Sequence, residues 1–116
     1  MFLLIYCNEE ILQGEALSFN SELQIWERAS NNNQPLCIAR KNAEARNDKF
    51  AVEAVFSGAV FARASRSIPI EGGALQVENG GVYVDNSVSN CGIICPQIID
   101  NENQRNQGDL VQVVIG

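Results

Sequence analysis

The sequence consists of short apolar runs, rich in Val, Ile and Phe, separated by clusters of Asn, Asp, Ser and Gly. No segment keeps apolar residues at helical spacing over several turns, so the pattern predicts an all-β protein. One helical turn is predicted at residues 61–67, before Pro69 keeps the backbone of Ile68 extended. The predicted strands are Met1–Cys7, Ala16–Phe19, Leu23–Glu27, Leu36–Arg40, Phe50–Phe61, Ala74–Val77, Gly81–Val84, Gly92–Cys95 and Leu110–Ile115.

The longest of these runs indicates how the strands turn. Phe50–Phe61 is too long for one simple strand, and Gly58 within it predicts a bulge or bend at which the chain changes direction or sheet. Surface turns are predicted at Ser30–Gln34, at Glu78–Gly81, which contains an Asn-Gly pair, and at Asp100–Gly108. Together these features favour a small antiparallel β-barrel.

Two halves of the chain resemble each other. Gly14-Glu15-Ala16-Leu17 is similar to Gly72-Gly73-Ala74-Leu75, and Val52-Glu53-Ala54-Val55 is similar to Val111-Gln112-Val113-Val114. Between them, Leu36-Cys37-Ile38-Ala39 corresponds loosely to Cys91-Gly92-Ile93-Ile94. With 116 residues and 46% hydrophobic content, we expect one β domain at residues 14–116, with 14–61 and 72–116 as its repeated halves.

Composition excludes several classes of function. The net charge of −6 opposes contact with a phosphate backbone, so no nucleic-acid partner is expected. The longest apolar run, Met1–Cys7, is far shorter than the roughly 20 residues of a membrane-spanning helix, and it has neither the basic start nor the small-residue end of an export signal. Histidine is absent, which removes imidazole-based catalysis and imidazole metal ligands.

No catalytic, cofactor-binding or metal-ligating residues are predicted, and the protein is not expected to be an enzyme. Four cysteines favour buried free thiols in a reducing compartment, and Cys91 and Cys95 would lie roughly 13 Å apart along a strand. Gly72-Gly73 and Gly80-Gly81 are turn glycines, because neither pair is followed by the Lys-Ser/Thr of a phosphate-binding loop. Adjacent Glu9 and Glu10 point to opposite sides of an extended chain and form a solvated collar.

The apolar start of the chain is the strongest candidate for a contact surface. As a strand, Phe2, Leu3, Leu4, Ile5 and Tyr6 place apolar side chains on both faces, so one face needs a second cover. One interpretation is an extended arm at residues 1–13 that docks on a neighbouring subunit or a partner. The other is a first strand fully buried in the domain's own core.

Two further features have alternative interpretations. Trp26 alternates with Leu23, Ile25 and Glu27, which favours a core position or a contact between subunits over a stacking platform for a ligand. Six of the eight basic residues lie within residues 40–66, either as ordinary surface charge or as a patch that meets an acidic protein. These six are Arg40, Lys41, Arg46, Lys49, Arg63 and Arg66.

The order of several short blocks resembles the capsid cement, or head-decoration, proteins of tailed bacteriophages. Asn8-Glu9-Glu10-Ile11-Leu12-Gln13-Gly14-Glu15-Ala16-Leu17 is similar to that family's opening Asn-x-x-Ile-x-x-Gly-(Asp/Glu)-x-Leu. The resemblance continues to the end, although Ala54 replaces a usual Gly and no Trp follows Tyr83. The later blocks are Pro35-Leu36-Cys37-Ile38-Ala39, Val52-Glu53-Ala54-Val55-Phe56, Gly81-Val82-Tyr83-Val84-Asp85, Cys91-Gly92-Ile93-Ile94 and Gly108-Asp109-Leu110-Val111-Gln112-Val113.

The resemblance implies a small β-barrel or β-tulip-like domain that works as a structural virion protein. Such a protein is made in the host cytoplasm, binds the outside of an expanded icosahedral head, commonly as a homotrimer, and clamps neighbouring major capsid subunits. It needs no cofactor and no membrane. We expect the capsid or subunit contacts to come from Phe2, Leu3, Leu4, Ile5, Tyr6 and Trp26.

A different class of function also fits the sequence. A soluble β-barrel module could bind carbohydrate or another small ligand through Trp26, Tyr83 and the Asn-rich loops. An aromatic content of 7% does not favour this alternative. An enzyme with a cysteine nucleophile is the weakest candidate, because the chain offers no base to activate the thiol.

Overall fold

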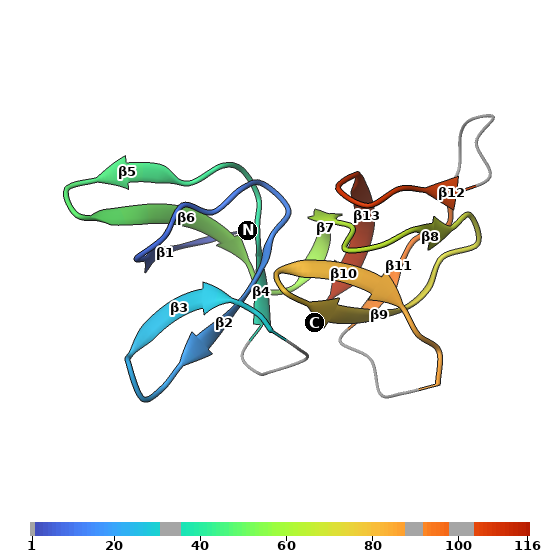
Figure 1. Cartoon of the computed structure of the whole chain (residues 1–116), viewed down its shortest axis with the longest axis horizontal. Coiled ribbons are helices and arrows are strands. Elements are labelled where there is room, and N and C mark those ends of the chain that lie inside the picture. Colours follow the sequence, from blue (N-terminus) through green and yellow to red (C-terminus); the bar gives the residue numbers. More distant parts are fainter. Residues whose placement is uncertain (1, 31–35, 88–91, 98–103) are drawn as a thin grey trace.

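The computed structural model describes residues 2–30, 36–87, 92–97 and 104–116, and every regular element among them is a β-strand. The all-β prediction is confirmed. The molecule measures 44 × 27 × 23 Å, with an N-terminal barrel at one end and a C-terminal sheet at the other (Figure 1). The helical turn predicted at residues 61–67 is wrong, because a strand continues to Arg63 and Ala64 then bridges Val82.

The N-terminal barrel has five strands in the order β1-β3-β2-β4-β6, and pairing of β6 with β1 closes it. The pairing of β1 with β3 is parallel, whereas the others are antiparallel. The barrel is therefore mixed, not wholly antiparallel as predicted. A further strand, β5 (Glu44–Arg46), forms a hairpin with β6. The barrel strands are β1 (Leu3–Cys7), β2 (Ala16–Asn20), β3 (Ile25–Arg28), β4 (Leu36–Ala39) and β6 (Lys49–Val55).

The C-terminal sheet is antiparallel, with the strand order β10-β9-β11-β13-β7. A single parallel bridge between Ala64 and Val82 joins its two ends. A small two-stranded sheet pairs β8 (Ile68–Pro69) with β12 (Gln104–Arg105). The five strands are β7 (Gly58–Arg63), β9 (Gly73–Glu78), β10 (Gly81–Val84), β11 (Gly92–Ile94) and β13 (Leu110–Ile115).

The barrel and the C-terminal sheet have the same topology and the same register. Strands β1, β2, β3, β4 and β6 correspond in order to β7, β9, β10, β11 and β13. The predicted halves, 14–61 and 72–116, divide the chain differently, because they leave β1 outside and count β7 with the first half. The residue pairs of the barrel have counterparts in the C-terminal sheet: Cys7–Trp26 corresponds to Ala64–Val82, Phe19–Trp26 to Val77–Val82, Ala16–Ile38 to Ala74–Ile93, Ile38–Val55 to Ile93–Val114, and Ile5–Val52 to Ala62–Val111.

Each unit has an apolar core, and the two cores share a boundary. Inside the barrel, the buried cluster is Ile5, Cys7, Ile11, Leu17, Cys37, Ala39, Val52 and Ala54. Three residues that face out of the barrel, Ala16, Leu36 and Ile38, belong instead to the core cluster of the C-terminal sheet. The outer side of β2 and β4 therefore packs against the C-terminal sheet, and the two units form one folded body.

The N-terminal run is not an arm. Strand β1 pairs with β6 over five residues, from Leu3 opposite Ala54 to Cys7 opposite Phe50, and Ile11 in the following loop is buried. The strand is not fully buried either, because its inner side chains enter the barrel while its outer ones stay exposed. Both sequence interpretations of residues 1–13 therefore need correction, since a closed barrel covers one face of its strands and leaves the other to solvent.

The predicted change of sheet at Gly58 is confirmed. Strand β6 ends at Val55 in the barrel, and β7 begins at Gly58, with φ +96°, in the C-terminal sheet. The turn predicted at Asn79-Gly80 is also present, with positive φ at both residues. Residues 31–34 and 100–103 of the other two predicted turns lie outside the described residues, as does Cys91. The described rest of Asp100–Gly108 begins with strand β12.

Candidate functional site

Three apolar side chains are exposed along the outer side of β1 and are here called the β1 face: Phe2, directly before the strand, and Leu4 and Tyr6 on it. Leu3 is also exposed, at the start of the strand, whereas Ile5 is buried in the barrel core. Alternation along the strand explains the difference, because successive side chains point to opposite faces. Four of the five predicted contact residues of the N-terminal run are therefore accessible, and Ile5 is not.

A charged cluster borders the β1 face. The Arg40 guanidinium lies over the Phe2 ring, 4.4 Å from its centroid, and its Nε is 2.8 Å from Glu53 Oε1. Lys41 Nζ lies 2.9 Å from Glu53 Oε2. The hydrogen bond from Lys41 lowers the pKa of Glu53, and the Arg40 contact adds to this effect. These charges are paired with each other at the edge of the apolar surface.

Trp26 lies on β3, opposite Phe19 of β2. Its ring packs edge-on against Phe19, at 5.3 Å between centroids, and against Phe56, at 5.5 Å. It is half-buried and packs against the barrel core. The structure therefore does not bring Trp26 together with the β1 face as one contact surface.

A second exposed apolar surface lies on the C-terminal sheet and was not predicted. We call it the β13 face. In β13, alternation buries Val111, Val113 and Ile115 and leaves the other positions exposed. This alternation is visible in the sequence and could have predicted the exposed residues of β13. Ile93, in contrast, lies in a strand of three residues, which is too short to show an alternation. The β13 face consists of Ala59, Phe61, Ile93, Leu110, Gln112 and Val114, all exposed.

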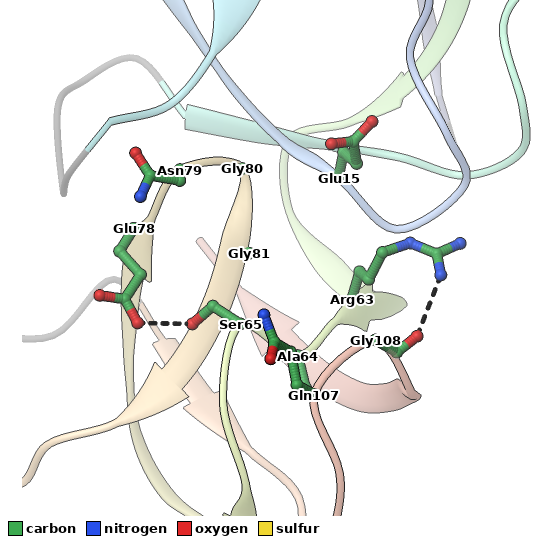
Figure 2. A pocket seen from close by; sticks show the side chains of 10 residues that line it. All are labelled: Glu15, Arg63, Ala64, Ser65, Glu78, Asn79, Gly80, Gly81, Gln107 and Gly108. Atoms are coloured by element: carbon green, nitrogen blue, oxygen red, sulfur yellow. Dashed lines mark hydrogen bonds between the residues drawn. The ribbon is translucent and has the colours of Figure 1, made fainter.

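A polar cleft of about 410 Å³ lies where the barrel meets the C-terminal sheet (Figure 2). Ser65 Oγ donates a hydrogen bond to Glu78 Oε2 at 2.8 Å, and Arg63 Nη1 donates to the Gly108 carbonyl at 3.0 Å. Glu15 enters from the barrel side of the cleft. The polar side chains of the cleft are thus largely engaged with each other or with backbone.

Backbone hydrogen bonds join the two units beside this cleft. The Ala16 N–H donates to the Gly80 carbonyl at 2.7 Å, and the Gly80 N–H donates to the Ala29 carbonyl at 2.7 Å. The Arg63 N–H donates to the Gly14 carbonyl at 2.8 Å. Gly14 has φ +87°, and a Cβ there would lie 2.6 Å from Leu110 Cδ2 and 2.9 Å from the Arg63 nitrogen. Only glycine fits this joint without a shift of its neighbours.

Arg28 organises the loop between β1 and β2. Its Nε lies 2.6 Å from Glu15 Oε2, its Nη1 lies 2.8 Å from Glu9 Oε1, and its Nη2 donates to the Glu10 carbonyl. Glu15 is buried, and its Oε1 accepts the Leu12 N–H at 2.7 Å. The hydrogen bond to Glu15 raises the pKa of Arg28. Glu9, predicted to belong to a solvated collar, therefore takes part in an ion pair.

The thiols inside the barrel are protonated at neutral pH. Burial raises the pKa of Cys7 to about 11 and that of Cys37 to about 12. Cys95 is a half-buried free thiol. Among the described residues, no group of three or more Cys, Asp or Glu side chains is placed to hold a metal ion.

Comparison of the chain with family models, with curated proteins and with solved structures finds no match. Within the described ranges, no helix is long and apolar enough to cross a membrane.

Proposed function

We propose that this protein is a structural virion protein that binds the outside of an expanded icosahedral phage head and clamps neighbouring major capsid subunits. The class of function, and a β-tulip-like classification of the fold, come from the resemblance to capsid cement proteins. The observation that carries the proposal is the β1 face, where Leu4 and Tyr6 are exposed on one side of β1 and Phe2 is exposed directly before it.

A preformed strand is a favourable element for such a contact. Burial of one large apolar side chain contributes about 1.5–3 kcal/mol. A disordered arm must first be ordered, at a cost of about 1–2 kcal/mol per residue. In this protein β1 is already fixed by its pairing with β6 and β3, so docking of the β1 face avoids most of that cost.

Clamping requires that one decorating unit touches more than one capsid subunit. Packaged DNA pushes the shell outward, and subunits held by a shared binder must lose that binder before they separate. The proposed partners are the major capsid protein and further copies of this chain. The net charge of −6 suits a location on the outer capsid surface, away from the genome.

Binding to purified heads tests this proposal. We expect the protein to bind expanded, undecorated heads and to raise their resistance to heat. Leu4→Glu, which places a charge on the β1 face, should abolish binding, whereas Leu23→Glu at the exposed turn between β2 and β3 should not. Failure of the wild-type protein to bind both expanded and unexpanded heads, or equal binding by Leu4→Glu, would contradict the proposal.

The polar cleft at the joint between the units is the observation that favours a second candidate, a module for carbohydrate or another small ligand. Trp26 does not offer this candidate an open stacking surface, because its ring packs against Phe19 and Phe56. A glycan screen read through Trp26 fluorescence separates the two functions. A saturable response that Glu78→Gln weakens would support the binding module over the clamp.

A further inference from the structure

We propose that the β13 face pairs with the same face of a second copy of this chain, as a two-fold symmetric dimer. This inference rests on the repeated topology of the molecule and does not depend on the proposed function. It assigns a partner to the β13 face, whereas the resemblance to cement proteins implies only self-association in general.

The β13 face is a continuous surface across three paired strands. Ile93, Val114 and Ala59 lie side by side, because Val114 pairs with Ile93 on one side and with Ala59 on the other. Phe61 lies opposite Gln112 on the next outward-facing row. None of its six exposed side chains is charged. Arg63, which lies opposite Leu110 at the edge of the face, is half-buried and donates to the Gln13 and Gly108 carbonyls. Exposed, uncharged apolar patches of this kind mark protein contacts.

The N-terminal barrel shows what covers part of this face, the Ile93 and Val114 positions. The barrel counterparts of Ala59 and Phe61 are Phe2 and Leu4, which are exposed. Ile38 and Val55 correspond to Ile93 and Val114, because each pair faces outward at the same register. Ile38 belongs to the core cluster of the C-terminal sheet and is 0% exposed, and Val55, at the end of β6, is 8% exposed. Ile93 and Val114 are 51% and 39% exposed. In the barrel, the Ile38 position packs against the other β unit, whereas no described residue buries its counterpart Ile93 in this way.

A second copy cannot pack on the C-terminal sheet in the way that this sheet packs on the barrel of its own chain. In the barrel, the Ala16 N–H donates to Gly80 of the C-terminal sheet. The corresponding N–H, that of Ala74, donates instead to Asn86 Oδ1 of its own unit at 2.7 Å. Ala29 accepts the Gly80 N–H, whereas the corresponding carbonyl, that of Asp85, accepts Gln76 Nε2 at 3.2 Å. The backbone sites that would receive another unit's hairpin are therefore already satisfied.

What remains open is an exposed, largely apolar surface with no unmet hydrogen bonds at these sites, and the same surface of a second copy can cover it. Two copies that each carry a charge of −6 repel elsewhere, so an uncharged face is the favourable place for them to meet. A contact between identical patches is isologous and closes at two copies. Both β1 faces stay outside this contact, since β1 belongs to the barrel.

Sedimentation equilibrium over a range of concentrations tests the pairing. We expect the wild-type protein to reach twice the mass of one chain, and Val114→Glu and Ile93→Lys each to return it to one chain mass. Leu23→Glu, at an exposed site on the barrel, should remain a dimer. Thermal melts confirm that each variant is folded. A wild-type monomer at all concentrations, a trimer, or a dimer that both β13-face variants leave intact would overturn the proposal.

A cysteine at the centre of the face tests the symmetry. Gln112 lies on β13, the middle strand of the face, so Gln112→Cys should form a disulfide-linked dimer under mild oxidation, because like residues meet near a two-fold axis. Wild type and Leu23→Cys, treated in parallel, should not. Absence of this cross-link in a dimer would overturn the two-fold pairing. None of these outcomes involves heads, so failure here leaves the head-binding result to be judged separately.

Discussion

Val52 and Val111 occupy the same position in two units of identical register. Val52 lies opposite Ile5 on β1, and Val111 lies opposite Ala62 on β7. Both side chains point inward and are fully buried. The same substitution at Val52 and at Val111 therefore compares how much each core contributes to the free energy of unfolding.

Val52→Ala and Val111→Ala should each lower the free energy of unfolding by about 2–3 kcal/mol, from lost burial plus the cavity left behind. Both should keep a single unfolding transition, because Ala16, Leu36 and Ile38 link the barrel to the core of the C-terminal sheet. Urea denaturation followed by Trp26 fluorescence and by far-UV circular dichroism measures this. Leu23→Ala, at an exposed site, is the control. Transitions that separate between the two probes would show independent units.

Gly14→Ala should destabilise the protein more than Gly58→Ala. Both glycines have positive φ, +87° and +96°, so alanine carries similar backbone strain at each, about 1–2 kcal/mol. A Cβ at Gly58 meets nothing within 4 Å, whereas at Gly14 it collides with Leu110 and the Arg63 backbone. The difference in unfolding free energy between the two variants isolates this steric cost. Equal losses would show that the joint at Gly14 adapts easily.

Asn86→Ala should cost about 0.5–1.5 kcal/mol, because it removes the acceptor of the Ala74 N–H. Asn86→Asp keeps an oxygen at the same place and should retain most of the stability. Thermal denaturation of the three proteins measures the effect. If alanine and aspartate behaved alike, the side-chain acceptor at position 86 would have no stabilising role.

Alkaline pH should destabilise the protein through the thiols of Cys7 and Cys37. Their folded-state pKa values, about 11 and about 12, lie above the unfolded value of 9.0. The unfolded chain therefore loses these protons first, and stability present below pH 9 is lost as pH rises toward 11–12. Urea midpoints measured from pH 7 to 11 test this.

A double variant, Cys7→Ala with Cys37→Ala, is the control for that experiment. It should be less stable at neutral pH, because both side chains are buried. Its stability should nevertheless fall less between pH 9 and 11 than that of the wild type. An unchanged alkaline slope would mean that other groups cause the loss.

Much of the strand pattern was predictable from the sequence, because β-branched runs bounded by turn residues have few alternatives. The run at residues 50–61 was correctly divided by Gly58. Strand β5 was missed because Glu44–Arg46 is short and fully exposed, so only its hairpin with β6 defines it. The parallel pairing of Cys7 with Trp26 could not be predicted either, because no local sequence pattern indicates which distant strands close a barrel.

The candidate contact surfaces were harder to predict. Phe2 to Tyr6 read as apolar on both faces, yet the structure buries only Ile5 among them. Burial depends on which side of β1 faces the barrel interior, and a uniformly apolar run carries no such information. The local sequence does not predict the exposure of Ile93 either, because its counterpart Ile38 has similar neighbours in sequence and is fully buried.

Strand β1 finds both of its neighbours later in the chain, β3 and then β6, just as β7 pairs with β13 and its following residue Ala64 with Val82. A ribosome must therefore have released residues up to about Ala54 before the first strand can be enclosed, and up to about Ile115 for the second unit. Until then β1 or β7 is an apolar strand without its pairing strands, and the chain is most prone to aggregation at this stage of synthesis. Chaperone demand should accordingly be greatest for nascent chains, not for the finished protein.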